Sequence, residues 1–84
     1  MPPELHREDG FSIRIYRNDH PPPHVHVVKA DGVMRIALGD ADVAPWILSV
    51  SGMKPSDQAR ATQLVRLLKT ELLIAWKEMR NARS

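Results

Sequence analysis

The sequence predicts an α+β fold, in which a small antiparallel sheet of three to four strands packs against one long C-terminal helix. Short stretches between residues 11 and 50 alternate apolar and polar side chains with a period of two, as half-buried strands do. Over residues 54–81 the apolar positions recur instead at steps of three and four, which is typical of an amphipathic helix. A chain of 84 residues accommodates one hydrophobic core, so residues 1–84 are expected to form a single domain.

The first strand is expected to start at Phe11. Residues 1–10 are polar and contain two prolines, so this segment is expected to be flexible. Alternation from Phe11 onward predicts a half-buried strand. Its two faces carry Phe11, Ile13 and Ile15 on one side, and Ser12, Arg14 and Tyr16 on the other.

A hairpin is predicted over residues 24–38. Asp31-Gly32 is a strong signal for a two-residue turn, because a type I′ turn needs positive φ at both central positions. With that loop, strands 24–29 and 33–38 pair so that apolar residues meet on a common face. The predicted pairs are Ala30 with Val33, Val27 with Ile36, His26 with Ala37, and Val25 with Leu38.

The rest of the chain is expected to form a loop, a short strand and the helix. Residues 39–45 are expected to form the loop, 46–50 a fourth strand, and 54–81 the helix, whose first turn suits Pro55. About 25 helical residues would span roughly 37 Å, which is long for so small a sheet. An overhanging end of the helix is therefore a candidate oligomer contact. The predicted apolar stripe is Ala61, Leu64, Val65, Leu68, Leu72, Ala75, Trp76 and Met79, with Leu68, Leu72 and Trp76 expected deepest.

The composition narrows the classes of function. The chain has no cysteine, which excludes disulfides and thiolate metal sites and favours a cytoplasmic location. No apolar stretch approaches the ~18 residues of a membrane span, so no membrane association is expected. A net charge of +2 permits contact with RNA without indicating it.

One segment concentrates the side chains that carry chemistry. Residues 18–27 read Asn-Asp-His-Pro-Pro-Pro-His-Val-His-Val and hold three of the four histidines. The prolines make a stiff, extended lead-in. On the strand that follows, His24 and His26 point to one face, because side chains alternate across a strand. Arg14, Tyr16 and Arg35 are predicted to share that face.

This motif resembles the signature of a family of small, mostly bacterial proteins, domain of unknown function 4160. Members show an Asn-x-His-x-Pro-Pro-His-x-His-Val motif, a hairpin, and a helix with Leu-Leu-x-Ala-Trp, which resembles residues 72–76 here. This chain has fewer aromatic residues in its first strand and a longer stretch between Leu38 and the helix. The resemblance implies the α+β fold and a small cognate partner protein, because the family's genes often neighbour another small family, as in toxin–antitoxin pairs.

Three interpretations of the histidines remain open. In the first, His24 and His26 act as general acid and base on a phosphodiester, with Arg14, Tyr16 and Arg35 stabilising charge and no cofactor. In the second, His20, His24 and His26 bind a divalent metal such as zinc in a metal-dependent hydrolase, with Asp40 or Asp42 available to complete the site. In the third, the motif is a rigid scaffold for binding a partner protein.

The function predicted from the sequence is that of a small component of a toxin–antitoxin-like two-gene system. It would bind its partner protein and act on RNA through the face that carries the histidines and arginines. A metal-binding module or a metal-dependent hydrolase is the alternative.

Overall fold

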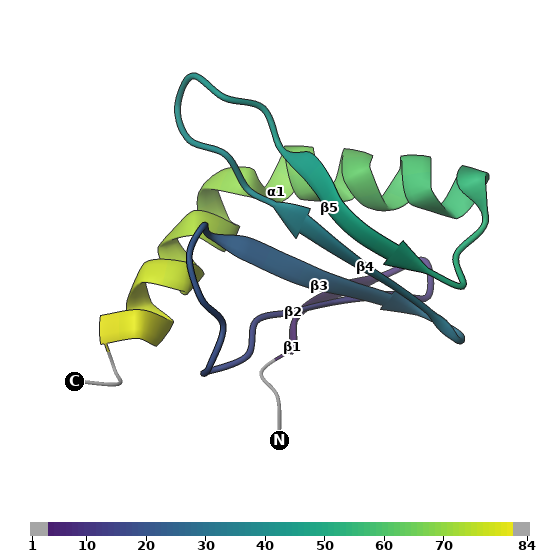
Figure 1. The fold of residues 1–84 in the computed structure, drawn as a ribbon, viewed down its shortest axis with the longest axis horizontal. Helices are drawn as coiled ribbons and strands as arrows, with labels where there is room; N and C mark the ends of the chain where they lie inside the picture. The colour runs from purple at the N-terminus through teal and green to yellow at the C-terminus, as the bar shows by residue number, and fades with distance from the viewer. Residues whose placement is uncertain (1–3, 82–84) are drawn as a thin grey trace.

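The computed structural model describes residues 4–81, which form a five-stranded antiparallel sheet followed by one helix (Figure 1). The strands pair in sequence order from β1 to β5, so neighbours along the chain are neighbours in the sheet. The α+β class is confirmed, with five strands instead of three to four. The elements are β1 (Glu4–Glu8), β2 (Phe11–Arg14), β3 (His24–Lys29), β4 (Gly32–Ala37), β5 (Trp46–Ser51) and α1 (Pro55–Asn81).

The additional strand is β1, which lies within the segment that was expected to be flexible. It pairs antiparallel with β2 across a turn at Asp9-Gly10. Both turn residues have positive φ, 54° and 84°, as a tight hairpin turn requires. The Asp-Gly pair was therefore a readable hairpin signal, and Leu5 fixes the strand by packing against the core. Residues 1–3, also part of that expectation, lie outside the described residues.

The β3–β4 hairpin forms, but its predicted register is wrong by two residues. The turn is Ala30-Asp31, and Lys29 pairs with Gly32. Gly32 serves a different purpose, because a Cβ there would lie 2.7 Å from the backbone oxygen of Gly52. A shift of two keeps every side chain on its predicted face. The observed pairs include His24 with Ala37, Val25 with Ile36, His26 with Arg35, and Val27 with Met34.

The core lies between one face of the sheet and α1. The alternating residues Phe11, Ile13 and Ile15 are buried there, as are Val25 and Val27. On α1, Leu72 and Trp76 are buried as predicted, whereas Leu68 is only partly buried. The deepest helix positions lie earlier: Ala61, Leu64 and Val65.

Helix α1 is long for the molecule. Its 27 residues would span about 40 Å if straight, whereas the largest extent of the molecule is 37 Å. Figure 1 shows that the helix follows one side of the sheet and then bends, so that its last turns pass the start of β3. Within residues 4–81, no helix has both the length and the apolar character needed to cross a bilayer.

Strand β5 forms the second edge of the sheet and confirms the predicted fourth strand. Its pairing with β4 shifts between Arg35, opposite Ser49, and Ile36, opposite Ile47. Leu48 is thus an extra residue in a β-bulge, which bends a strand locally and places two residues opposite one.

Candidate metal and acid–base site

The predicted face lies on the three central strands of the sheet, and both histidines come from β3. His26 in β3 lies between Arg14 of β2 and Arg35 of β4 in the register, so these three side chains share one side of the sheet. Val25 and Val27 point to the other side and are fully buried. The alternation read from the sequence therefore sets the histidines on the face opposite the core.

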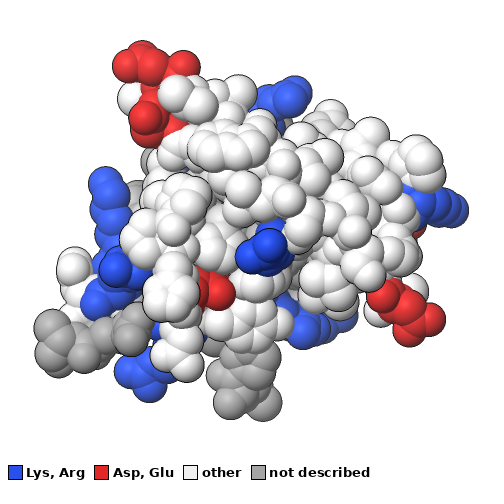
Figure 2. All heavy atoms as spheres, viewed as in Figure 1, with Lys and Arg blue, Asp and Glu red and all other residues white. Residues whose placement is uncertain are grey.

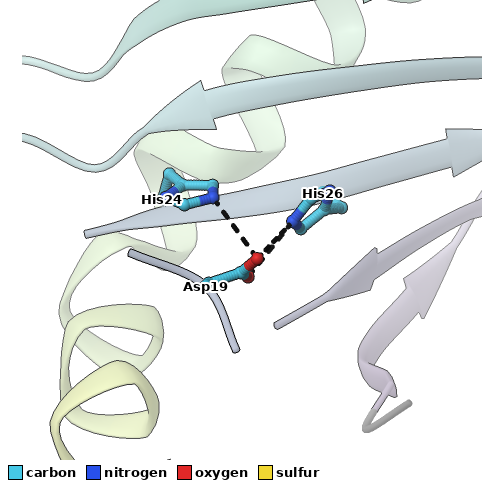
Figure 3. A group of neighbouring side chains, drawn as sticks. All are labelled: Asp19, His24 and His26. Carbon is cyan, nitrogen blue, oxygen red and sulfur yellow. Dashed lines mark hydrogen bonds and ion pairs between the residues drawn. The ribbon is translucent and has the colours of Figure 1, made fainter. Parts of the chain in front are cut away.

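Asp19 joins the two histidines into a compact cluster (Figure 3). The Nε2 atom of His26 lies 3.1 Å from both carboxylate oxygens of Asp19. The Nε2 atom of His24 lies 3.7 Å from Asp19 Oδ1. Figure 3 shows both rings turned toward the carboxylate, which comes from the loop before β3.

The ring of His24 is held from its other side. Its Nδ1 lies 2.9 Å from the carbonyl oxygen of Pro22. A carbonyl oxygen only accepts, so Nδ1 carries the proton and donates it to Pro22. In the neutral ring this leaves Nε2 as a lone-pair acceptor directed at the Asp19 carboxylate, which is also an acceptor. Two acceptors that face each other are stabilised by a cation or a proton between them.

Asp19 is itself held in place by a tight turn. The backbone N–H of Tyr16 donates to Asp19 Oδ2 at 3.0 Å, and the N–H of Asp19 donates to the carbonyl of Tyr16 at 3.1 Å. The Tyr16 ring meets His26 edge-on, with ring centroids 4.5 Å apart. The carboxylate and both imidazoles thus have fixed orientations before any ligand binds.

The last turns of α1 cover the cluster. The indole of Trp76 packs at a tilt against the His24 ring, with centroids 5.3 Å apart. Arg80 stacks over Trp76 at 5.7 Å and donates to the carbonyl of Asp19 at 3.2 Å. As a result His24 is only 6% exposed, and the site is built from two segments that are far apart in the sequence.

The other predicted residues have varied positions. Tyr16 contacts His26, as described above. Arg35 lines a pocket of about 370 Å³ together with Asp19, His24 and Leu48. Arg14 lies opposite His26, but its Nε donates to Ser12 at 2.9 Å.

The structure places the residues of the metal set proposed from the sequence in different surroundings. His20 lines the same pocket but is exposed and lies outside the cluster. Asp40 and Asp42 lie in the loop between β4 and β5, where Asp40 accepts the N–H groups of Asp42 and Val43. Neither belongs to the cluster found among the described residues.

Asp19 and Trp76 are the site residues that the sequence reasoning missed. Asp19 stands inside the motif, seven residues before His26, but its distance from the strand concealed that the proline loop folds back. Trp76 was assigned to the buried apolar stripe of the helix. The family resemblance could have indicated that Trp76 belongs to the site, because it pairs the histidine motif with a Leu-Leu-x-Ala-Trp segment.

The two distances from Asp19 to the histidine nitrogens are close to the spacing of ligands around a small divalent ion. Two ligands at the ~2.0–2.1 Å distances of zinc in tetrahedral geometry lie about 3.3 Å apart. Asp19 is 3.1 Å from His26 and 3.7 Å from His24, and the three ligand atoms lie within 4.8 Å of one another. Two histidines and one carboxylate match a known ligand set that leaves positions open for substrate or water.

The comparisons with known proteins add a family and nothing on chemistry. A family model described as "Domain of unknown function (DUF4160)" matches residues 10–77, which include the whole cluster. No curated protein and no solved structure matches the chain.

Proposed function

The chain belongs to the DUF4160 family, whose function is unknown, and we propose from its own residues that it is a metal-dependent phosphodiesterase acting on RNA. Asp19, His24 and His26 would bind a divalent transition-metal ion, with zinc as the first ion to test. The partner protein and the two-gene system expected from the sequence belong to the same proposal and are treated last.

The observation that carries the proposal is the orientation of His24. Its Nδ1–H is used by Pro22, so its Nε2 lone pair faces the Asp19 carboxylate 3.7 Å away. Metal-binding histidines commonly donate their second ring N–H to a backbone carbonyl, which fixes the ring as a ligand. Asp19 has the corresponding support from the Tyr16 N–H. The residues around His24 and Asp19 therefore fit a metal site.

The surroundings favour an anionic substrate. The pocket beside the cluster is bordered by Arg35, whose guanidinium can bind a phosphate oxygen. A divalent ion would supply Lewis-acid chemistry by lowering the pKa of water and polarising a phosphoryl oxygen. In the hydrolysis, water adds to phosphorus, the bond to the leaving oxygen breaks, and that oxygen takes up a proton. Arg35 would stabilise the negative charge that develops.

Zinc is expected to stabilise tag-free protein and to support RNA cleavage. A free zinc concentration of 100 times the dissociation constant adds about 2.7 kcal/mol, or roughly 10–20 °C in melting temperature for a domain this small. A thermal melt with zinc, manganese or EDTA measures the shift, and a labelled RNA oligonucleotide reports cleavage. Absence of both a shift and bound metal in the purified protein would contradict the proposal.

The same experiment distinguishes the metal-free alternative. A proton can also occupy the space between His24 Nε2 and Asp19, so His24 and His26 could act as an acid–base pair beside Arg35. RNA cleavage that persists in EDTA and is lost in the His26→Ala variant would favour that mechanism.

We further propose that the protein acts in the cell as one component of a toxin–antitoxin-like pair with a small partner protein. The gene organisation implied by the family resemblance supports this. Induction of the protein alone is expected to arrest bacterial growth, and Asp19→Asn is expected to relieve the arrest at equal soluble level. Arrest that the variant leaves unchanged would place the activity away from the cluster.

A further inference from the structure

The two edges of the sheet differ in how they are protected. Edge strand β1 carries Glu4, Arg7 and Glu8 and has an irregular register, and charges and irregularities both discourage pairing with another chain. Edge strand β5 has no charged residue and no proline. Four of its six side chains are apolar and 38–44% exposed: Trp46, Ile47, Leu48 and Val50. Figure 2 shows a broad uncharged surface where β5 lies in Figure 1.

Because of the bulge, the order in which the side chains of β5 point to the two faces of the sheet is the same from either end of the strand. Ile47 and Val50 lie opposite the buried Ile36 and Met34, so they are on the helix side of the sheet. The opposite side of the sheet, which carries His24 and His26, is called the histidine face. It includes the β4 residues that pair with Trp46, Ser49 and Ser51, and Leu48 borders the pocket on that face. From Trp46 to Ser51 the six side chains lie in turn on the histidine face, the helix side, the histidine face twice, the helix side and the histidine face. This order is the same from either end of the strand.

We propose that a second copy of the chain pairs with β5 in antiparallel orientation about a two-fold axis between Leu48 and Ser49. This register places partners on a common face, as antiparallel pairing requires. Shifting it by one residue would place a histidine-face residue opposite a helix-side residue. The pairs across the axis would be Trp46 with Ser51, Ile47 with Val50, and Leu48 with Ser49. Two-fold contacts of this self-complementary type are the commonest in soluble oligomers.

The charges at the two ends of β5 support a second copy as the occupant. The loop before the strand carries the exposed Asp42, and the segment after it carries the exposed Lys54. Antiparallel pairing would bring the loop before β5 of one copy beside the segment after β5 of the other, so Asp42 of one copy would lie at the same end of the contact as Lys54 of the other. The pairing occurs twice by symmetry, and the strands between are neutral. Both Asp19 clusters would lie on the same side of one continuous sheet.

Sedimentation equilibrium of the full chain tests this proposal. The wild-type protein is expected to show twice its 9.5 kDa chain mass at high micromolar concentration, with or without zinc. Ile47→Lys is expected to give a monomer, because lysine on an edge strand discourages pairing. Leu67→Lys is the matched control, since Leu67 is a more exposed apolar residue on α1, and it should remain a dimer.

Charge reversal tests the register. Asp42→Lys or Lys54→Asp alone should weaken dimerisation about five- to tenfold, more at low salt, and the double variant should restore it. A wild-type monomer, or loss of the dimer in Leu67→Lys but not in Ile47→Lys, would overturn the proposal. A wild-type monomer would mean that β5 does not pair with a second copy and is available to a different protein. Loss of the dimer in Leu67→Lys alone would mean that the helix forms the contact. Because the assay needs no metal or activity, its outcome is independent of the proposed function.

Discussion

Replacing His24 with alanine is expected to lower the affinity for zinc by more than about 100-fold. Loss of a residue that only supports a metal ligand typically costs 10–100-fold, and His24 would be one of only three ligands from the protein. Asp19→Asn should have a comparable effect, because it removes the ligand charge while keeping the shape of the side chain. Competition with a chromogenic chelator measures both affinities.

His20→Ala is the matched control for these variants. His20 belongs to the same motif and lines the same pocket, but it is exposed and outside the cluster. Its replacement should leave zinc affinity within about threefold of the wild type, a change near 0.6 kcal/mol. Equal losses of zinc affinity for His20→Ala and His24→Ala would instead support the ligand set predicted from the sequence, which includes His20. Because His24 is buried, its variant is compared at equal folded fraction, and Asp19→Asn provides the second measurement.

The second large effect is expected in the core of the helix. Leu64→Ala should destabilise the protein by about 2–5 kcal/mol, because Leu64 is 2% exposed and its truncation leaves a cavity. At roughly 4–8 °C per kcal/mol, the melting temperature should fall by at least about 8 °C. A thermal melt followed by circular dichroism measures the difference.

Leu67 and Leu68 provide controls of the same residue type on the same helix. Leu67 is 69% exposed, so Leu67→Ala should change stability by less than about 0.5 kcal/mol. Leu68 is partly buried, so its variant should fall between the other two. If Leu68→Ala were the most destabilising of the three, the order of burial predicted from the sequence would hold instead of the one in the structure.

Most of the fold follows from local pattern. The helix boundaries and the strand that bears the histidines match the sequence prediction closely, because periodicity and turn residues are local signals. The errors arose at two turns whose residues were misinterpreted. Gly32 was assigned to a turn, although its lack of a Cβ is needed beside Gly52. The Asp9-Gly10 turn was overlooked because the segment before it is polar, as an exposed edge strand can be.

The site was predictable only in part. Alternation along β3 placed His24 and His26 on one face, whatever the register. The position of Asp19 depends on how the proline segment folds back through the turn with Tyr16, which no periodicity describes. The contact of Trp76 with His24 depends on the bend of the helix past the sheet. Contacts of this kind are set by tertiary packing.

The cover that α1 places over the cluster links the site to local unfolding. Helix ends open more readily than the core, and opening the last turns would separate Trp76 from His24 and Arg80 from Asp19. A ligand that binds only the closed form raises the free energy of that opening by its own binding free energy. Amide hydrogens near Trp76 would therefore exchange more slowly when a ligand occupies residues 19–26. With such a ligand, the distal turns of the helix would be a cover whose stability depends on occupancy of the site.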